Sequence, residues 1–134
     1  YSYVQAVPIR LARIGELQLA LGQVEEIEDL DTKAASLAGI AAVLIESGEP
    51  DKARELISSA VEVIEKSEYP YYQVDVYCKI ASVYALALEE KLLNQALSAA
   101  LVKAKQIDDA EEKTSRLQRI ADTSIKLGQW DLAL

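Results

Sequence analysis

The chain has 134 residues, and its hydrophobic content of 51% excludes a disordered polymer. A formal net charge of −8 argues against binding to nucleic acid or to an anionic membrane surface, because like charges repel. The absence of histidine excludes histidine-based nucleophile activation and histidine-containing zinc sites, and a single cysteine, Cys78, excludes an internal disulfide. No apolar run is long enough to span a membrane, so no membrane insertion is expected.

The hydrophobic pattern predicts helices and no strand. Gly48 is expected to end one helix in a left-handed conformation, and Pro50 to stand in the first turn of the next. Pro8 should either kink the first helix or mark its start. The predicted helices span residues 3–14, 16–29, 31–47, 50–66, 70–88, 91–108 and 110–127, and an eighth begins at 129.

An internal repeat runs through the chain. Its clearest mark is an Ile-Ala pair that recurs at a constant spacing, at Ile40-Ala41, Ile80-Ala81 and Ile120-Ala121. Each unit is predicted to be a helical hairpin with two apolar faces, and a hairpin cannot bury both faces alone. Neighbouring hairpins must therefore stack, which predicts an all-α solenoid.

The second unit carries a more detailed pattern, in which large and small apolar residues alternate around a turn glycine. The pattern is Leu37, Ile40, Ala41, Leu44, Gly48, Ala53, Ile57 and Ala60. It resembles the tetratricopeptide repeat (TPR), and the resemblance covers nearly the whole chain. The resemblance implies a right-handed α-α superhelix of about 3.5 repeats in one domain. The repeats would comprise residues 1–30, 31–68, 69–109 and 110–134.

The sequence departs from that repeat in two respects. The third unit lacks the turn glycine and is expected to carry three extra residues in "LEEKLLN". The first repeat interval, from Val4 to Leu37, is also shorter than the next two, which run to Tyr77 and to Leu117. Extra turns on the second helix of the later hairpins would explain this difference. The chain lacks an initiator methionine and stops early in the eighth predicted helix, so we expect a fragment of a longer array.

The resemblance also implies a concave groove, lined by the first helix of each hairpin, that binds a protein or peptide partner. The centre of the implied groove is small and apolar, whereas its ends are polar. An apolar peptide or an amphipathic helix would fit such a lining, but close packing of adjacent helices would require small residues as well. The implied lining is Gln5, Ile9, Arg13, Ala38, Ala42, Ile45, Glu46, Asp75, Cys78, Ser82, Ala85, Leu86, Gln118, Asp122, Ile125 and Lys126.

Three tyrosines form a second candidate site. Tyr69, Tyr71 and Tyr72 stand where the matching stretches read "EDLDTK" and "DDAEEK", within an expected three-residue expansion between two helices. The repeat does not require aromatic residues there. They are expected either to cap the preceding helix or to form an aromatic edge beside the groove.

The sequence offers no catalytic, cofactor-binding or metal-binding site. Cys78 has no imidazole to activate it, so it is interpreted as a packing residue. A clamp for a partner's terminal carboxylate is not favoured, because the only asparagine lies outside the first helices. We therefore expect a non-enzymatic interaction module, with a cytoplasmic location favoured. The alternatives are a self-association or spacer module, in which exposed array ends pair as a homo-oligomer, and a regulatory arm of an enzyme that lies outside this segment.

Overall fold

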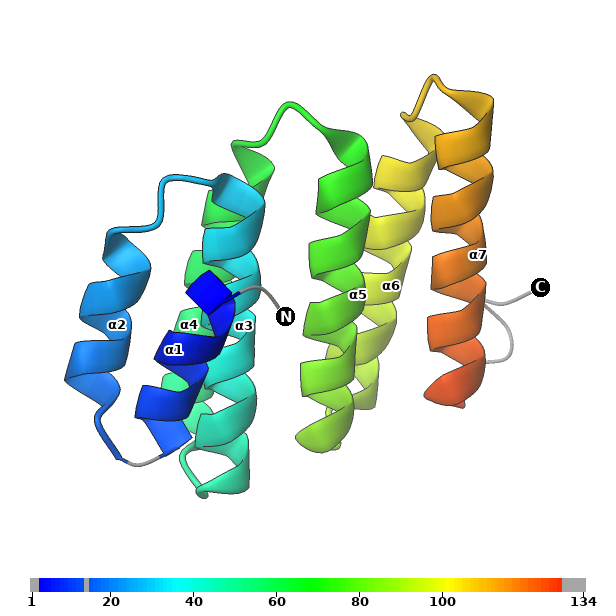
Figure 1. The fold of residues 1–134 in the computed structure, drawn as a ribbon. Helices are drawn as coiled ribbons and strands as arrows, with labels where there is room; N and C mark the ends of the chain where they lie inside the picture. The colour runs from blue at the N-terminus through cyan, green and yellow to red at the C-terminus, as the bar shows by residue number, and fades with distance from the viewer. Residues whose placement is uncertain (1–2, 14, 129–134) are drawn as a thin grey trace. The chain divides into compact units, whose positions relative to one another are not determined.

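The computed structural model describes residues 3–13 and 15–128, with the backbone alone for residues 3–6. Within these ranges the protein is all-α, with seven helices and no strand, as predicted (Figure 1). The chain divides into two compact units, unit 1 up to Lys66 and unit 2 from Ser67. The helices are α1 (Tyr3–Arg13), α2 (Leu17–Glu25), α3 (Leu30–Glu46), α4 (Pro50–Glu65), α5 (Pro70–Leu86), α6 (Glu90–Lys105) and α7 (Ala110–Lys126).

Unit 1 contains α1 to α4. Helices α3 and α4 form an antiparallel hairpin, and α1 packs against both α2 and α3 (Figure 1). The apolar positions recur at helical spacing, so each helix turns one stripe toward its neighbours. The buried side chains include Ala20, Val24, Leu37, Ile40, Ala41, Leu44, Ala53, Ile57, Ala60 and Ile64.

Unit 2 contains α5, α6 and α7. Helices α5 and α6 form the second hairpin, and α7 packs against both of them (Figure 1). Tyr77 belongs to this core, as its place in the repeat predicts. The other buried side chains include Ile80, Ala81, Leu93, Ala96, Leu97, Ala100, Ala104 and Ile120. Alanine and branched aliphatic residues thus dominate both cores.

The turns that follow α1, α3, α5 and α7 share one backbone conformation. Gly15, Gly48 and Gly128 have φ angles of 87°, 80° and 80°, which confirms the left-handed conformation predicted at Gly48. Leu88 takes the same place after α5, with φ of 57°. The amide that follows closes the same kind of bond in both hairpins, from Glu49 N to the Leu44 carbonyl and from Glu89 N to the Tyr84 carbonyl.

This equivalence corrects the expected insertion in "LEEKLLN". Helix α6 begins two residues after Leu88, as α4 begins two residues after Gly48, so the third unit has no extra residues. Leu97 therefore stands where Ile57 stands in α4, whereas the expected insertion would have placed Ala100 there. The error arose because a leucine replaces the glycine that would have marked the turn.

The change in repeat spacing has a simple source. Helices α4 and α6 each contain 16 residues, whereas α2 contains 9. The shorter α2 accounts for the shorter first interval of the repeat. The predicted helix 16–29 was wrong at its end, because Glu26 and Ile27 bond back to Gln23 and Val24 and Asp29 already precedes α3 as its N-cap.

The expected expansion before α5 is also absent. The turn from α4 to α5 spans residues 66–69, and the turns before α3 and α7 are equally long, at 26–29 and 106–109. Tyr69 therefore occupies the N-cap position that Asp29 and Asp109 occupy elsewhere.

The N-terminal helix contains Pro8. Helix α1 begins at Tyr3 and continues through Pro8 to Arg13, so the alternative that the helix starts near Pro8 was wrong. The predicted eighth helix lies outside the described residues. In the part of the chain that the structure describes, no helix combines the length and the apolar character needed to cross a membrane.

We expect Leu88→Gly to raise the free energy of unfolding by about 1 kcal/mol, because a non-glycine residue at positive φ has a steric cost that glycine avoids. This gain exceeds the effect of the added entropy of the unfolded chain. The Leu88 side chain is 91% exposed, so little packing is lost. Urea unfolding measures the change, and the reciprocal variant Gly48→Leu should lower stability by a similar amount. A destabilised Leu88→Gly protein would show that the leucine is held by contacts outside the turn.

Candidate functional site

The implied groove residues lie on α1, α3, α5 and α7, and three of them are buried. Ile9, Ala38 and Cys78 expose almost no surface, so a ligand cannot reach them in this structure. The Gln5 side chain lies outside the described part of the chain. The remaining positions are half-buried or exposed, and a partner could contact all of them except Asp75, which is paired with arginines of α7.

In unit 1, the groove positions at the ends of α1 and α3 meet. Arg13 Nη1 lies 3.6 Å from Glu46 Oε2, and both side chains are about half exposed. An ion pair in that setting contributes little to stability. Ala42 and Ile45 are half-buried on α3. Arg13 and Glu46 thus remain accessible to a polar partner, beside a modest apolar surface.

In unit 2, the groove positions at the ends of α5 and α7 carry large apolar side chains. Leu86 is 53% exposed and Ile125 is 45% exposed. Helices α5 and α7 pack together and run in the same direction (Figure 1). Ser82 and Lys126 are exposed and Ala85 is half-buried, so these positions combine apolar, short polar and charged side chains. Gln118 donates a 2.8 Å hydrogen bond to Asp122 one turn further along α7.

Asp75 lies at the contact between α5 and α7, where two arginines surround it. Its Oδ1 lies 3.0 Å from Arg116 Nε and 3.2 Å from Arg119 Nε, but neither approach has hydrogen-bond geometry. Arg116 Nη2 donates to Asp75 Oδ2 at 3.2 Å. Burial raises the pKa of Asp75, and the two guanidiniums oppose this effect. Asp75 therefore holds the helices together and is not presented to a partner.

Arg116 is the centre of this cluster. It also donates from Nε to the Tyr71 carbonyl at 3.3 Å and from Nη1 to Glu112 at 3.1 Å. Its side chain is only 17% exposed. The spacing of Glu112 and Arg116 indicates an ion pair along one helix, but no local pattern reveals the contacts with α5. With its donors engaged in this way, Arg116 does not offer a clamp for a partner's carboxylate.

Cys78 is an inert thiol. Burial raises its pKa to about 11, and the neighbouring Thr123 on α7 offsets only part of this effect. Because the thiolate is the reactive form, a thiol with this pKa is a poor nucleophile. The interpretation of Cys78 as a packing residue is therefore preferred over a reactive or ligand-binding role.

The three tyrosines form one cluster at the start of α5. Ring centroids are 5.6 Å apart for Tyr69 and Tyr71, 5.7 Å for Tyr69 and Tyr72, and 4.6 Å for Tyr71 and Tyr72. Tyr69 is 51% exposed and its side chain makes no capping hydrogen bond to α5. The Arg116 guanidinium stands 5.6 Å from the centre of the Tyr71 ring. The three rings therefore lie together at the start of α5.

Sequence reasoning missed a pair of titratable groups at the start of α3. Burial and the neighbouring Asp29 raise the pKa of Asp31 to about 6, whereas the Thr32 hydroxyl, which bonds Asp29, lowers the pKa of Asp29. Divergent carboxyl pKa values can mark a catalytic pair. Here the two carboxyl groups stand at the N-terminal end of α3, and Asp29 is exposed. Carboxylates are common at this end of a helix, so we interpret the pair as part of the helix start and not as a catalytic pair.

We expect Asp31→Asn to stabilise the protein by about 1 kcal/mol at pH 7, because burial disfavours the ionised carboxylate. A raised pKa in the folded state means that the ionised Asp31 opposes folding above pH 6, and the penalty disappears as the pH falls from about 6 toward the ordinary value of 3.8. Urea unfolding should therefore show a higher free energy of unfolding for Asp31→Asn than for the unaltered chain at pH 7, and no difference at pH 4. Asp51→Asn, at the matching position in the first turn of α4, controls for loss of a charge there. An equal gain at both pH values would contradict the assignment.

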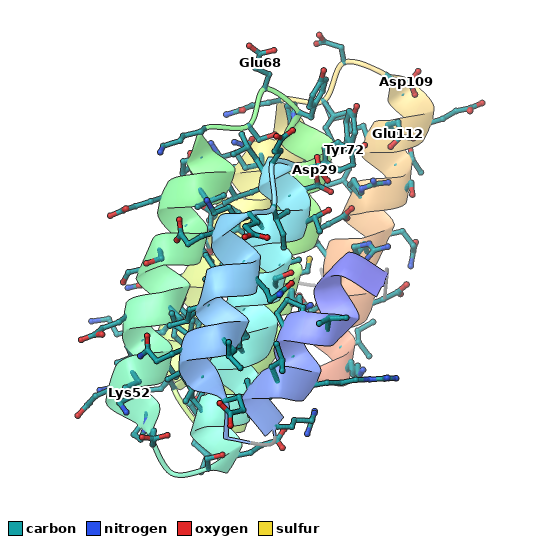
Figure 2. The ribbon with its side chains drawn as sticks, turned by 60° about the vertical axis from the view of Figure 1, so that its left-hand side comes forward. Asp29, Lys52, Glu68, Tyr72, Asp109 and Glu112 are labelled. Carbon is teal, nitrogen blue, oxygen red and sulfur yellow. The ribbon has the colours of Figure 1, made fainter. Side chains whose placement is uncertain are left out.

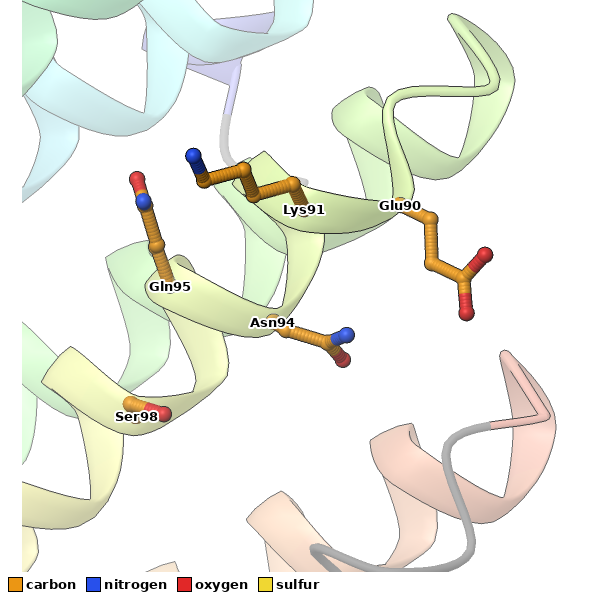
Figure 3. A pocket seen from close by; sticks show the side chains of 5 residues that line it. All are labelled: Glu90, Lys91, Asn94, Gln95 and Ser98. Carbon is orange, nitrogen blue, oxygen red and sulfur yellow. The ribbon is translucent and has the colours of Figure 1, made fainter.

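A polar hollow also lies along α6, lined by Glu90, Lys91, Asn94, Gln95 and Ser98 (Figure 3). All five side chains come from one helix and most are exposed, so the hollow is open and does not enclose a ligand. No cluster of cysteine and carboxylate side chains in residues 3–13 and 15–128 is arranged to hold a metal ion. Comparison of the chain with protein-family models, with curated proteins and with solved structures finds no match.

Proposed function

We propose that the chain is a TPR-like helical-repeat module, stacked as a right-handed superhelix, that binds an apolar peptide or an amphipathic helix of a protein partner. The partner would contact the first helix of each hairpin, and no catalysis is assigned to the module. The observation that carries the proposal is the exposure of Leu86 and Ile125 at the implied groove positions of unit 2. This assignment rests on the sequence resemblance and on the features below.

The regularity of the first helices supports a repeat array. Helices α3, α5 and α7 each contain 17 residues and begin at residues 30, 70 and 110. A residue with the same left-handed conformation follows each of them, at 48, 88 and 128. Hairpins that repeat this regularly are typical of arrays in which each unit contacts its neighbours.

The chemistry of the surface supports an apolar partner. A single exposed leucine or isoleucine is common on protein surfaces, but these two occur near the ends of two helices that pack together. The implied groove positions on α5 also include the small residues Ser82 and Ala85. Small neighbours leave room for the apolar anchors of a partner helix, which recur every three or four residues. The polar ends of the surface, such as Gln118 and Lys126, would then fix the orientation of the ligand.

Selection from a display library of random peptides tests the proposal without knowledge of the natural partner. Peptides enriched on the intact chain are measured against Leu86→Ser and Ile125→Ser, which remove one apolar anchor each without adding charge. The matched controls are Leu19→Ser and Val102→Ser, which change equally exposed apolar residues on α2 and α6. We expect the first pair to weaken binding about tenfold and the controls to leave it unchanged.

Two outcomes would contradict the proposal. Peptides that bind the groove variants as tightly as the intact chain would place the binding surface elsewhere. Failure to enrich any peptide, together with dimerisation in sedimentation that Leu86→Ser abolishes, would identify the same surface as a self-association site.

A further inference from the structure

We propose that the tyrosine edge, Tyr69, Tyr71 and Tyr72, is a second docking surface that takes an arginine-bearing segment of a protein partner. The edge lies at the start of α5, whereas Leu86 lies at the opposite end of that helix and Ile125 lies near the end of α7. The inference does not depend on the groove, and it rests on three observations within unit 2.

The first observation is that the Tyr69 side chain does not cap the helix that it precedes, although the Tyr69 carbonyl accepts hydrogen bonds from the Tyr72 and Gln73 amides. At the matching position before α7, Asp109 accepts a hydrogen bond from the backbone amide of Glu112. Aspartate is among the preferred N-cap residues, whereas tyrosine is not. Tyr69 makes no such bond, and its own amide instead donates to Ser67 Oγ at 3.1 Å. The chain thus places a half-exposed aromatic ring where a capping residue would stabilise the helix.

The second observation is that one ring of the edge already receives a guanidinium. Arg116 stands 5.6 Å from the centroid of the Tyr71 ring, within the range of a cation–π contact. Tyr69 presents 51% of its surface to solvent and leans against Tyr72 at an interplanar angle of 80°. The contacts between the rings hold Tyr69 in place, so its exposed surface is offered to a partner in a fixed orientation.

The third observation is the charge that surrounds the edge. Residues 67–72 and 107–112, which form the matching helix starts of unit 2, contain five carboxylates. The basic residues nearest to them are Lys66 and Lys113, which flank the two segments in the sequence, and Arg116, which is already paired with Asp75 and Glu112. Figure 2 shows Glu68, Tyr72, Asp109 and Glu112 at the same end of the unit. An aromatic surface with acidic neighbours attracts a cationic partner and disfavours an anionic one. The five carboxylates, all of them exposed, are Glu68, Asp108, Asp109, Glu111 and Glu112.

The tyrosine edge should prefer an arginine of the partner to a lysine. A planar guanidinium stacks on an aromatic ring and can donate to a carboxylate at the same time, whereas a lysine ammonium is a compact and strongly hydrated charge. Arg116 shows both contacts together, since it meets the Tyr71 ring and also bonds Glu112. A partner arginine over Tyr69 could reach a carboxylate such as Glu68 in the same manner.

Fluorescence anisotropy with two labelled probes tests the inference. The probes are an arginine–glycine repeat peptide and a lysine–glycine repeat peptide of equal length, measured on the full chain at physiological salt. Tyr69→Ala removes the ring but keeps every charge, Tyr69→Phe keeps the ring, and Leu88→Ala is the control at the other end of α5. Circular dichroism checks that each variant keeps its helices, and Glu68→Gln provides a second variant that leaves the tyrosines intact.

We expect the arginine probe to bind more tightly than the lysine probe, and Tyr69→Ala to weaken the arginine probe about fivefold. Tyr69→Phe and Leu88→Ala should bind as the unaltered chain does, and Glu68→Gln should weaken binding to a smaller extent. The inference would be overturned if both probes bound equally tightly, or if Tyr69→Ala kept the full affinity for the arginine probe. Either result would show that the acidic chain attracts any cationic peptide. Leu86→Ser should not affect the arginine probe, so failure at the edge and failure at the groove can be told apart.

Discussion

Leu97→Ala is expected to lower the free energy of unfolding by about 3 kcal/mol, the largest effect of any substitution considered. Leu97 is fully buried in α6, at the place that Ile57 holds in α4. Truncation removes apolar contacts and leaves a cavity that the surrounding helices fill only in part. Urea unfolding followed by circular dichroism measures the change.

Val102→Ala provides the control for that substitution. Val102 lies on the same helix with 55% of its surface exposed, so its truncation should change stability by less than about 0.5 kcal/mol. A similar cost for both variants would mean that α6 turns a different face to the core. Because the expected insertion would have placed Ala100 and not Leu97 at this position of the repeat, the pair also tests the corrected alignment.

Arg116→Ala is expected to destabilise the protein by about 2 kcal/mol, because a largely buried carboxylate loses its main partner. The substitution leaves Asp75 with Arg119 alone, and it removes the hydrogen bonds to the Tyr71 carbonyl and Glu112. Arg116→Lys should recover only part of the loss, because an ammonium cannot make this set of directed bonds. Urea unfolding of the two variants measures both changes.

Arg54→Ala is the matched control, since Arg54 forms an exposed ion pair with Asp51 at 3.3 Å. It should cost less than about 0.5 kcal/mol. A double-mutant cycle of Arg116→Ala with Asp75→Ala isolates the energy of the pair itself. If the two substitutions are additive, then Arg116 stabilises the protein only through α7 and the Tyr71 backbone.

The helices of this protein were largely predictable because their starts carry local signals. Pro50 and Pro70 each stand at the first position of a helix, and Asp109 caps α7 through its side chain. These signals act within one turn of the chain, so they can be read from neighbouring residues. The end of α2 was less predictable, because its apolar pattern continues into a turn that precedes α3.

The candidate sites were less predictable, because they depend on contacts between distant residues. Asp75 was expected to line a groove, but two arginines from another helix, α7, surround it in the structure. The turn at Leu88 was not predicted, because nothing in the sequence marks a leucine that adopts a left-handed backbone conformation. The three tyrosines were recognised as unusual, and only the structure shows that Tyr69 replaces a capping residue.

The most direct test of the central proposal is NMR mapping of a selected peptide on the isotope-labelled chain. If α5 and α7 present the binding surface, amide shifts should change most at residues 82–86 and 122–126, and change little along α6. At the same peptide concentration, Leu86→Ser should reduce those changes as about tenfold weaker binding requires, while its own spectrum remains that of a folded protein. Shift changes confined to α2 and α6, or changes of undiminished size in Leu86→Ser, would contradict a binding surface on the first helices.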